Sequence, residues 1–487
     1  MGTQETIISG SALTLVLYML ALVGIGVWAS RKASSEADFL LGGRSLGPVV
    51  AGLAYAASTS SAWVLLGFTG FVAGAGVSAL WMVPGILAGY AAVWLWLGPY
   101  LNRVSREEGH LTALDVLAAG AGGPVGRAIK IVAAAMIVFC FSFYIAAQFQ
   151  GAGAAIGEVF GIGKTQAVVA GAGVILLYTF LGGFWAVSLT DTLQGMAIAA
   201  IALILPFAAF GAAGGFEGIA AGFAAQPEAM RATFGVHLGW SAVGFVFGLS
   251  AIGFGALGQP HLLTWVMAVR DRKARLQGAA VALGWGALVY AGMAVIALSA
   301  RALAEPGAPL GEAIVFNAAQ QMLPGVMPAL VYAAILSAIM STVDSQLLVA
   351  SAAASHDLGL AKRAPGREVA ITRAVIVALC AAAVVLTLYL PATIFDRVLF
   401  AWTALGAAFG PTLVARAAGR RPAPGAVLAA VLAGFFLAVV FNQVLPSGPG
   451  AWKERILPWV VGLLIVFIFS RKREPSVSDA SGAVRRR

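Results

Sequence analysis

The segment LSAIMSTVDSQLL, from Leu336 to Leu348, carries hydroxyl groups within one of the most apolar parts of the chain. At helical spacing, four of its residues fall at i, i+3, i+4 and i+7 and share one helix face: Ala338, Ser341, Thr342 and Ser345. Asp344 lies beside that face. Hydroxyl, carbonyl and carboxylate oxygens are hard ligands, which suit a small hard cation and bind soft metals poorly. The segment therefore predicts a site for a small hard cation.

Two long apolar segments are poorly suited to forming continuous helices. The first contains AASTSSAW, from Ala56 to Trp63, where four consecutive hydroxyl residues compete for backbone hydrogen bonds. The second contains GFGALGQPH, with three glycines followed by Pro260. Paired interruptions at matching places in two halves of a chain are typical of inverted-repeat transporters that bind near the middle of the membrane. The alternative is that both segments are tight packing faces.

The composition is that of a membrane protein that crosses the bilayer many times. Of the 487 residues, 60% are hydrophobic and only 10% are charged, whereas a soluble domain is about 25% charged. The mean hydropathy is +0.92. The two cysteines, Cys140 and Cys380, both lie in apolar runs, which favours small core residues over a disulfide framework.

Thirteen apolar runs are long enough to cross a hydrocarbon layer of ~30 Å, at roughly 20 residues each. They lie near residues 8–30, 46–73, 77–101, 128–157, 165–183, 186–213, 238–267, 277–300, 326–355, 369–390, 393–415, 423–443 and 456–470. Basic residues follow the first run and none precedes it, which is the opposite of a secretory signal. We therefore expect this run to be retained, with the N-terminus outside.

The basic residues support one topology. With the N-terminus outside and thirteen spans, the C-terminus is cytoplasmic, and 24 of the 30 Lys and Arg residues fall on cytoplasmic segments. The net charge of +10 then reflects orientation and attraction to the inner leaflet rather than nucleic-acid binding. We expect a multi-pass protein of the plasma (inner) membrane.

The two interrupted segments divide the chain into parts. We expect an all-α integral membrane fold of thirteen transmembrane helices, with a five-plus-five inverted-repeat core that contains two broken helices. The expected parts are an extra N-terminal transmembrane helix in 1–30, a first five-helix repeat in 31–213, a second in 214–415, two C-terminal transmembrane helices in 416–470 and a cytoplasmic tail in 471–487.

The hydroxyl face and the first interrupted segment together predict a sodium cage. A helix face opposed to broken backbone would offer five oxygens to one ion. They are the backbone carbonyls of Ala57, Ser60 and Ala338 and the hydroxyls of Ser341 and Thr342.

Five sequence motifs, in this order along the chain, carry a resemblance to a known family. They are FLLGGRSLGP (39–48), FWAVSLTDTLQ (184–194), GQPHLL (258–263), SAIMSTVDSQLLV (337–349) and LGAAFGP (405–411). From about residue 10 to 470, the chain resembles the solute:sodium symporters, especially the sodium/proline symporters. The resemblance implies the same fold as the interrupted segments, and it assigns the main sodium site to the same five residues.

The resemblance also implies residues for a second sodium ion or for cation coupling. Asp191 matches a family carboxylate linked to coupling, and some relatives hold a further sodium where this chain has Asp191, Ser341, Asp344 and Ser345. The alternative for Asp344 is a structural pairing with a nearby donor. Thr59 stands where the family often has an acidic or amide residue, so charge compensation of sodium from that position is in question.

The expected solute-binding residues surround the sodium cage. They are Ser61, Trp63, Tyr144 and Gln148, together with Ile252 and Ala256, which replace an aromatic pair of the family. Tyr144 matches a tyrosine that proline symporters use, whereas packing against neighbours is the alternative role for Trp63. Without the two large rings, the pocket is expected to be wider or shifted.

The expected function is sodium-coupled import of a small organic solute, with proline as the leading solute. The alternatives within this class are another amino acid or an organic acid. A membrane-embedded enzyme would need a His, Asp or Glu cluster with catalytic spacing, and the four histidines are scattered. A solute sensor would need a signalling domain, for which the tail after Phe469 is too short. We expect no catalytic residues, no cofactor and no metal other than Na⁺; the oligomeric state stays open.

Overall fold

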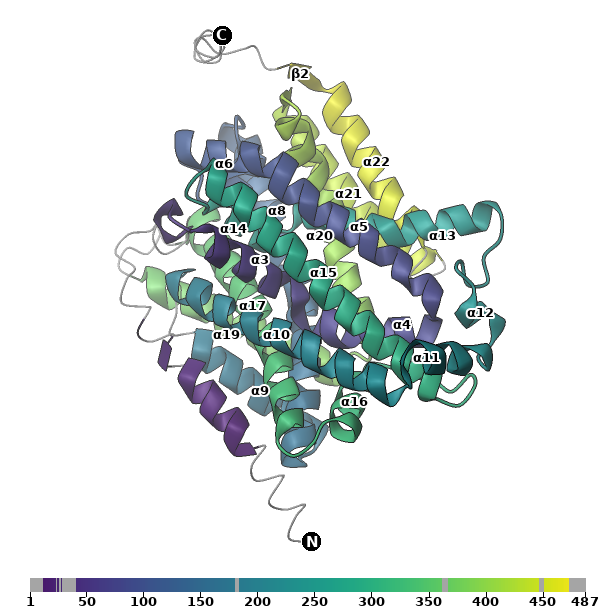
Figure 1. Ribbon diagram of the computed structural model, residues 1–487. Helices are drawn as coiled ribbons and strands as arrows, with labels where there is room; N and C mark the ends of the chain where they lie inside the picture. The colour runs from purple at the N-terminus through teal and green to yellow at the C-terminus, as the bar shows by residue number, and fades with distance from the viewer. Residues whose placement is uncertain are drawn as a thin grey trace.

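The structure is a computed structural model that describes residues 12–22, 24–25, 28, 41–179, 184–360, 367–445 and 451–472. Within these residues the chain is almost entirely helical, and long helices lie against one another in a bundle (Figure 1). The described residues hold one small antiparallel sheet, in which β1 (Arg420–Pro422) pairs with β2 (Ser470–Lys472).

The first half of the chain forms a helix at Ala12–Leu22 and the elements that follow it. They are η1 (Gly42–Arg44), α3 (Pro48–Ala62), η2 (Trp63–Phe68), α4 (Thr69–Ala75), η3 (Val77–Trp81), α5 (Met82–Ala91), η4 (Ala92–Leu97), α6 (Gly98–Glu107), α7 (Ala113–Ala118), α8 (Gly123–Phe160), α9 (Lys164–Thr179) and α10 (Phe184–Ala212).

The second half begins with two short helices and then repeats the pattern of long ones. Its elements are α11 (Gly215–Ala224), α12 (Glu228–Arg231), α13 (Trp240–Ser250), η5 (Ala251–Gly258), α14 (Pro260–Met267), α15 (Arg272–Leu303), α16 (Ile314–Met322), α17 (Met327–Ala352), η6 (Ala353–Asp357), α19 (Glu368–Tyr389), α20 (Ile394–Ala417), α21 (Pro424–Val444) and α22 (Trp452–Ile468).

Each of the thirteen predicted spans contains at least one helix. Among the described residues, ten helices are long and apolar enough to cross a membrane. The other three predicted spans hold shorter helices, namely Ala12–Leu22, α9 and α22. Multiple membrane crossings are therefore established, whereas the count of thirteen and the repeat boundaries stay predictions.

The first predicted break is present in α3. Ser61 has φ 45° and ψ 177°, which no helix accommodates, and a π-helical turn, η2, follows directly. Two hydrogen bonds to side chains serve the freed amides: Ala62 donates to Oε1 of Gln148 (2.8 Å), and Trp63 donates to Oγ of Ser61 (3.0 Å). Side chains must take this role because lipid offers no hydrogen-bond partners.

The second predicted break lies between α13 and α14. After α13 the chain continues as a 3₁₀ helix, η5, and then Gln259 adopts an extended conformation. Pro260 follows at the first position of α14, where its missing N–H leaves no hydrogen bond unmade. Both interruptions therefore fall within the segments that the sequence indicated.

Glycine allows the second broken helix to pack closely. A methyl group on Gly89 in α5 would overlap the carbonyl of Gly253 in η5, and one on Gly253 would overlap the carbonyl of Gly85 in α5. Close approach through glycine is a common way for membrane helices to associate.

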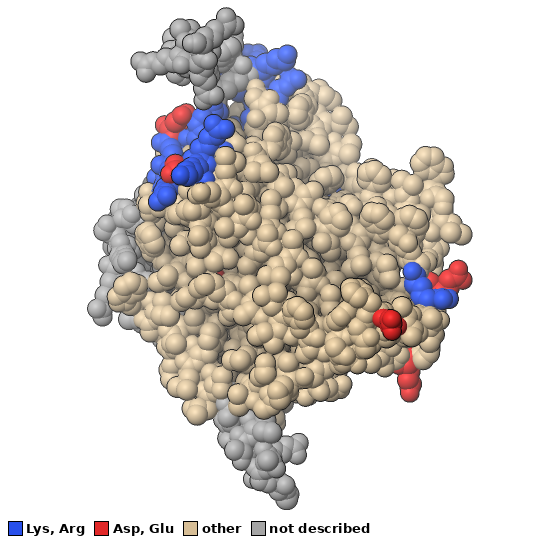
Figure 2. All heavy atoms as spheres, in the orientation of Figure 1, with Lys and Arg blue, Asp and Glu red and all other residues tan. Residues whose placement is uncertain are grey.

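Basic side chains gather at one end of the bundle, near α6 and β2 (Figure 2). At this end Leu46, just before α3, and Val269, just after α14, form a parallel β-bridge. Asn102 and Arg106 of α6 both donate to the carbonyl of Val269, at 2.7 and 2.8 Å. These contacts hold the ends of the two broken helices together. We refer to this end of the bundle, near α6 and β2, as the basic end.

Candidate functional site

The hydroxyl face of α17 lies against the first broken helix. The Thr342 hydroxyl donates to the carbonyl of Ser58 in α3 (3.2 Å) and to that of Ala338 (2.9 Å). The Ser341 hydroxyl also donates to the carbonyl of Ala338 (3.1 Å). Ala57 and Ser60 of α3 are buried. The structure therefore brings the face of α17 to the predicted stretch of α3, with the hydroxyls bonded to backbone carbonyls.

Ser58 is a central residue that the sequence analysis did not select. Its hydroxyl lies 3.4 Å from Oδ2 of Asp191 in α10, and it accepts hydrogen bonds from Ser345 (3.1 Å) and from the indole of Trp265 (3.2 Å). It therefore links four helices: α3, α10, α14 and α17. The run of four hydroxyls in AASTSSAW was a signal, but it did not show which hydroxyl faces α17.

The two predicted coupling carboxylates are buried and have different surroundings. Oδ1 of Asp191 has no hydrogen-bond partner among the described residues. Asp344 accepts a short hydrogen bond from the hydroxyl of Thr179 in α9 (2.6 Å). Asp191 is joined to Ser345 through Ser58, whereas Asp344 has the nearby donor that the structural alternative required.

A small closed pocket lies beside the break of α3. Ten described residues line it, and none is charged: Thr59, Trp63, Ile86, Tyr90, Tyr144, Ile252, Tyr290, Val398, Leu399 and Trp402. Its free volume is about 10 Å³, which is barely room for one water molecule. A solute with several heavy atoms therefore needs the walls to move apart.

Three of the six predicted solute residues line this pocket, and three do not. Trp63, Tyr144 and Ile252 are in the lining. Ser61 and Gln148 instead bind the amides freed by the break of α3, and Ala256 is fully buried outside the lining.

The expectation of a wider or shifted pocket stays a prediction; in this structure the large side chain beside Ile252 is Trp402 of α20. Its indole N–H donates to the carbonyl of Ile252 (2.8 Å). The ring lies so close to Gly255 that a methyl group there would overlap it. A large ring from α20 thus occupies the side of the pocket where Ile252 and Ala256 leave room.

Two tyrosines and an indole are among the hydrogen-bond donors that line the pocket. Tyr90 of α5 and Tyr290 of α15 lie near each other, and the Tyr290 hydroxyl makes no well-formed hydrogen bond among the described residues. The indole N–H of Trp63 also lacks a partner there. Neither tyrosine was predicted from the sequence, because each lies among apolar residues in a long apolar segment.

An aromatic stack packs against Trp63, one of the residues that line the pocket. Phe395, at the start of α20, stacks on Trp63 and on Phe71, with ring centroids 5.4 and 4.8 Å apart. Glu312, before α16, accepts hydrogen bonds from the amides of Ile394 (3.1 Å) and Phe395 (2.9 Å). Burial keeps the pKa of Glu312 above its usual value, although these two amides act in the opposite direction.

The chain is similar to several proline transporters over nearly its whole length. It is 29% identical over 459 residues to the high-affinity proline transporter PutP of Bacillus subtilis, covering 92% of this chain and 94% of that protein. It is also 29% identical over 470 residues to the sodium/proline symporter of Escherichia coli, covering 94% and 92% respectively.

Solved structures show the same fold. A Na⁺-coupled sialic acid symporter, in a substrate-bound outward-open state, superposes with a TM-score of 0.77 at 14% identity and covers 96% of this chain and 99% of that one. MHP1, a nucleobase-cation-symport-1 family transporter, matches with a TM-score of 0.58 at 11% identity, covering 90% and 96%. A family model matches residues 39–434, which confirms the resemblance, and the chain belongs to the Sodium:solute symporter family.

Proposed function

We propose that this sodium symporter imports a small organic carboxylate, with proline as the leading solute. The observation that carries the proposal is the pairing of the α17 hydroxyl face with the broken helix α3, next to a closed pocket that both broken helices line. An ion site beside a solute pocket allows each ligand to favour binding of the other.

The main sodium site is proposed at the interface of α3 and α17. Carbonyl oxygens of Ala57, Ser60 and Ala338 and the hydroxyls of Ser341 and Thr342 would hold the ion. The present bonds of Thr342 to two carbonyls support this, because a hydroxyl that lies among carbonyl oxygens needs only a small rotation to turn its lone pairs toward a cation.

A second sodium, or a coupling role, is proposed for Asp191, Ser345 and Asp344. The Ser58 hydroxyl lies between Asp191 and Ser345, and the Ser58 carbonyl accepts a hydrogen bond from Thr342, which supports a connection between the two ion sites. An uncompensated carboxylate within a membrane is costly and is usually functional, and Oδ1 of Asp191 lacks a partner among the described residues.

The solute class rests on the chemistry of the pocket wall. The indole of Trp63 and the hydroxyl of Tyr290 are buried donors that a carboxylate could satisfy. The aliphatic wall of Ile86, Val398 and Leu399 suits an apolar body. None of the described residues that line the pocket is charged, so a solute carboxylate would be balanced by the nearby sodium. The similarity to relatives named as proline transporters supports proline as the leading solute.

The proposed topology has thirteen transmembrane helices, an inverted five-plus-five core and a cytoplasmic C-terminus. The gathering of Lys and Arg at the basic end supports this orientation (Figure 2). A reporter fused after Arg487 should then report cytoplasm, and one placed before Thr3 should report the outside.

Uptake into membrane vesicles tests the proposal. Labelled amino acids and monocarboxylates are offered with an inward sodium gradient, and with potassium in its place as the control. We expect sodium-dependent accumulation of proline or of a similarly small carboxylate. Accumulation of a cationic or uncharged solute alone would contradict the carboxylate assignment.

A further inference from the structure

A cluster of charged side chains lies at the basic end, away from the proposed sodium sites. The ammonium of Lys130 in α8 lies 2.6 Å from Oδ1 of Asp115 in α7 and 3.4 Å from Oδ1 of Asp357 in η6. Nε2 of His356 lies 3.4 Å from Oδ2 of Asp115. The hydroxyl of Thr112 donates to Oδ1 of Asp357 (3.0 Å). Asp115, His356 and Asp357 each offer a ligand atom within 4.8 Å of the others.

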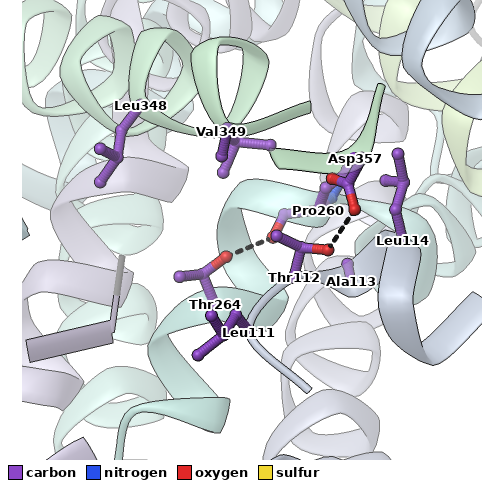
Figure 3. Close-up of a pocket in the computed structure, with 10 residues that line it drawn as sticks. Leu111, Thr112, Ala113, Leu114, Pro260, Thr264, Leu348, Val349 and Asp357 are labelled. Atoms are coloured by element: carbon purple, nitrogen blue, oxygen red, sulfur yellow. Dashed lines mark hydrogen bonds between the residues drawn. The ribbon is translucent and has the colours of Figure 1, made fainter. Parts of the chain in front are cut away.

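A cavity separates this cluster from the proposed sodium site. Thr112 and Asp357 point toward each other at its edge, and Pro260 and Thr264 of α14 also line it (Figure 3). Leu348, Val349 and Ala352 of α17 form another wall. Its free volume is about 20 Å³, which is enough for about one water molecule.

This cavity continues the hydroxyl face of α17. Counting by three and four residues from Ser341 and Ser345 leads to Val349 and Ala352, and then to His356. Ser345 and Asp357 are twelve residues apart, or about 18 Å along a helix. One face of α17 therefore leads from the sodium-binding stretch, past the cavity, to the charged cluster.

Asp357, which lines this cavity, has an unsatisfied oxygen. Its side chain is 1% exposed, and its Oδ2 has no hydrogen-bond partner among the described residues. Leaving a charged oxygen buried without a donor or cation is unfavourable. Lys130 and His356 are 27% and 22% exposed, so the cluster also reaches the solvent at the basic end.

The cluster is a local exception to the charge of its surroundings. With His356 neutral, the carboxylates of Asp115 and Asp357 face one ammonium, which leaves one negative charge. Arg416 of α20 binds the carbonyls of Leu117 and Ala119 at the far end of α7, and not the carboxylates. Elsewhere at this end Lys and Arg predominate (Figure 2), and their field repels a departing cation.

We propose that Asp357, with Asp115 and Thr112, forms an exit station that binds sodium on its way to the cytoplasm. Lys130 pairs with the two carboxylates when no sodium is there and is displaced when the ion arrives. This inference rests on the proposed sodium coupling and on the proposed orientation. It adds a transient site on the route out of the protein, distinct from the two sites at α3 and α10.

The competing role for the same residues is a latch that only holds α7 against α8 and α17. The two roles predict different directions of change in how strongly sodium at the cytoplasmic side inhibits uptake. A latch is weakened by loss of either partner, so Asp357→Asn and Lys130→Gln would act alike. In an exit station, Asp357→Asn removes an ion ligand, whereas Lys130→Gln removes the cation that competes with sodium. The two substitutions should then have opposite effects on sodium at the cytoplasmic side.

The test uses right-side-out membrane vesicles that are loaded with increasing internal NaCl. Internal sodium slows uptake of the labelled solute by rebinding from the cytoplasmic side. Asp357→Asn should raise the internal sodium concentration for half-inhibition on the order of three- to tenfold, and Lys130→Gln should lower it by a similar factor. The external sodium concentration for half-maximal uptake should stay within about twofold in both. Glu108→Gln, at an exposed carboxylate of the same end, is the matched control and should change neither value.

The outcomes distinguish failure of the exit station from failure of the proposed sodium symport. Shifts of the same sign in both variants, or no shift in either, overturn the exit station while sodium-dependent uptake by the wild type still stands. Absence of sodium-dependent uptake in the wild type contradicts the symport function itself. If Asp357→Asn is not produced, Lys130→Gln alone decides, because only an exit station predicts stronger inhibition by internal sodium.

Discussion

Thr342→Val removes a hydroxyl that joins α17 to the backbone of α3 and keeps the shape of the side chain. The Thr342 hydroxyl lies 3.2 Å from the Ser58 carbonyl and 2.9 Å from the Ala338 carbonyl, and the residue is fully buried. Valine places a methyl group at the same point, so packing is retained and one oxygen is lost. Thr342→Ser keeps the oxygen and is the matched control.

The expected loss of sodium affinity follows from the burial of the Thr342 hydroxyl. A buried polar partner that is left unsatisfied costs about 1–3 kcal/mol, and more where a charge is involved. Since 1.4 kcal/mol is a factor of ten, this corresponds to roughly a five- to 150-fold weaker apparent sodium affinity. Because coupling between two ligands is reciprocal, the solute concentration for half-saturation should also rise, mostly at low sodium.

The assay is initial uptake over a range of external sodium concentrations in vesicles that contain equal amounts of wild-type, Thr342→Ser or Thr342→Val protein. We expect Thr342→Ser to be mild and Thr342→Val to be severe. Unchanged sodium dependence in Thr342→Val would mean that the α17 hydroxyls only pack against α3 and that sodium binds elsewhere.

Three further predictions concern the pocket and the basic end. Ala256→Tyr should abolish uptake or folded protein, because Ala256 is fully buried and Trp402 already fills the neighbouring space; normal uptake with normal yield on size-exclusion chromatography would contradict this packing. Tyr290→Phe should raise the concentration of a carboxylate solute needed for half-maximal uptake by roughly five- to 100-fold at saturating sodium, because the hydroxyl that binds the carboxylate is lost. An unchanged concentration would remove Tyr290 from the solute site. Burial acts to raise the pKa of Asp115, but hydrogen bonds from His356 and Lys130 outweigh it and hold that pKa well below its usual range. A carboxylate with a lowered pKa stabilises the fold above its unfolded pKa and loses that effect as the pH falls through the folded value. The difference in melting temperature between wild type and Asp115→Asn in detergent should therefore shrink as the pH falls below about 4; a difference that stays unchanged from pH 5 down to about pH 2 would show that the pKa of Asp115 is not lowered.

The places where the chain breaks could be predicted from sequence because their cause is local. Four hydroxyl residues in a row disfavour a helix wherever they occur, and Ser61 of that run has the non-helical backbone. Glycines followed by Pro260 likewise indicated an interruption, and the structure has an extended residue, Gln259, at that place. The hydroxyl face of α17 followed from helical spacing alone.

The filling of the pocket could not be predicted in the same way. Trp402 comes from α20, about 150 residues beyond Ile252, and no local pattern indicates that its ring reaches the break. Tyr90 and Tyr290 lie on helices that are apolar on most sides, so hydropathy does not distinguish a residue facing the pocket from one facing lipid. Ser58 differed from its hydroxyl neighbours only in direction, which depends on the distorted backbone of α3.

Sodium-dependent uptake by the purified protein tests the central claim most directly. Proteoliposomes containing the wild-type chain are given labelled proline under an inward sodium gradient, under an equal potassium gradient, and under a sodium gradient with Thr342→Val in place of the wild type. We predict accumulation above equilibrium only with sodium and the wild type, and a loss in Thr342→Val that higher sodium restores. Equal accumulation with sodium and with potassium, for proline and for every other small carboxylate tried, would contradict sodium coupling at the interface of α3 and α17.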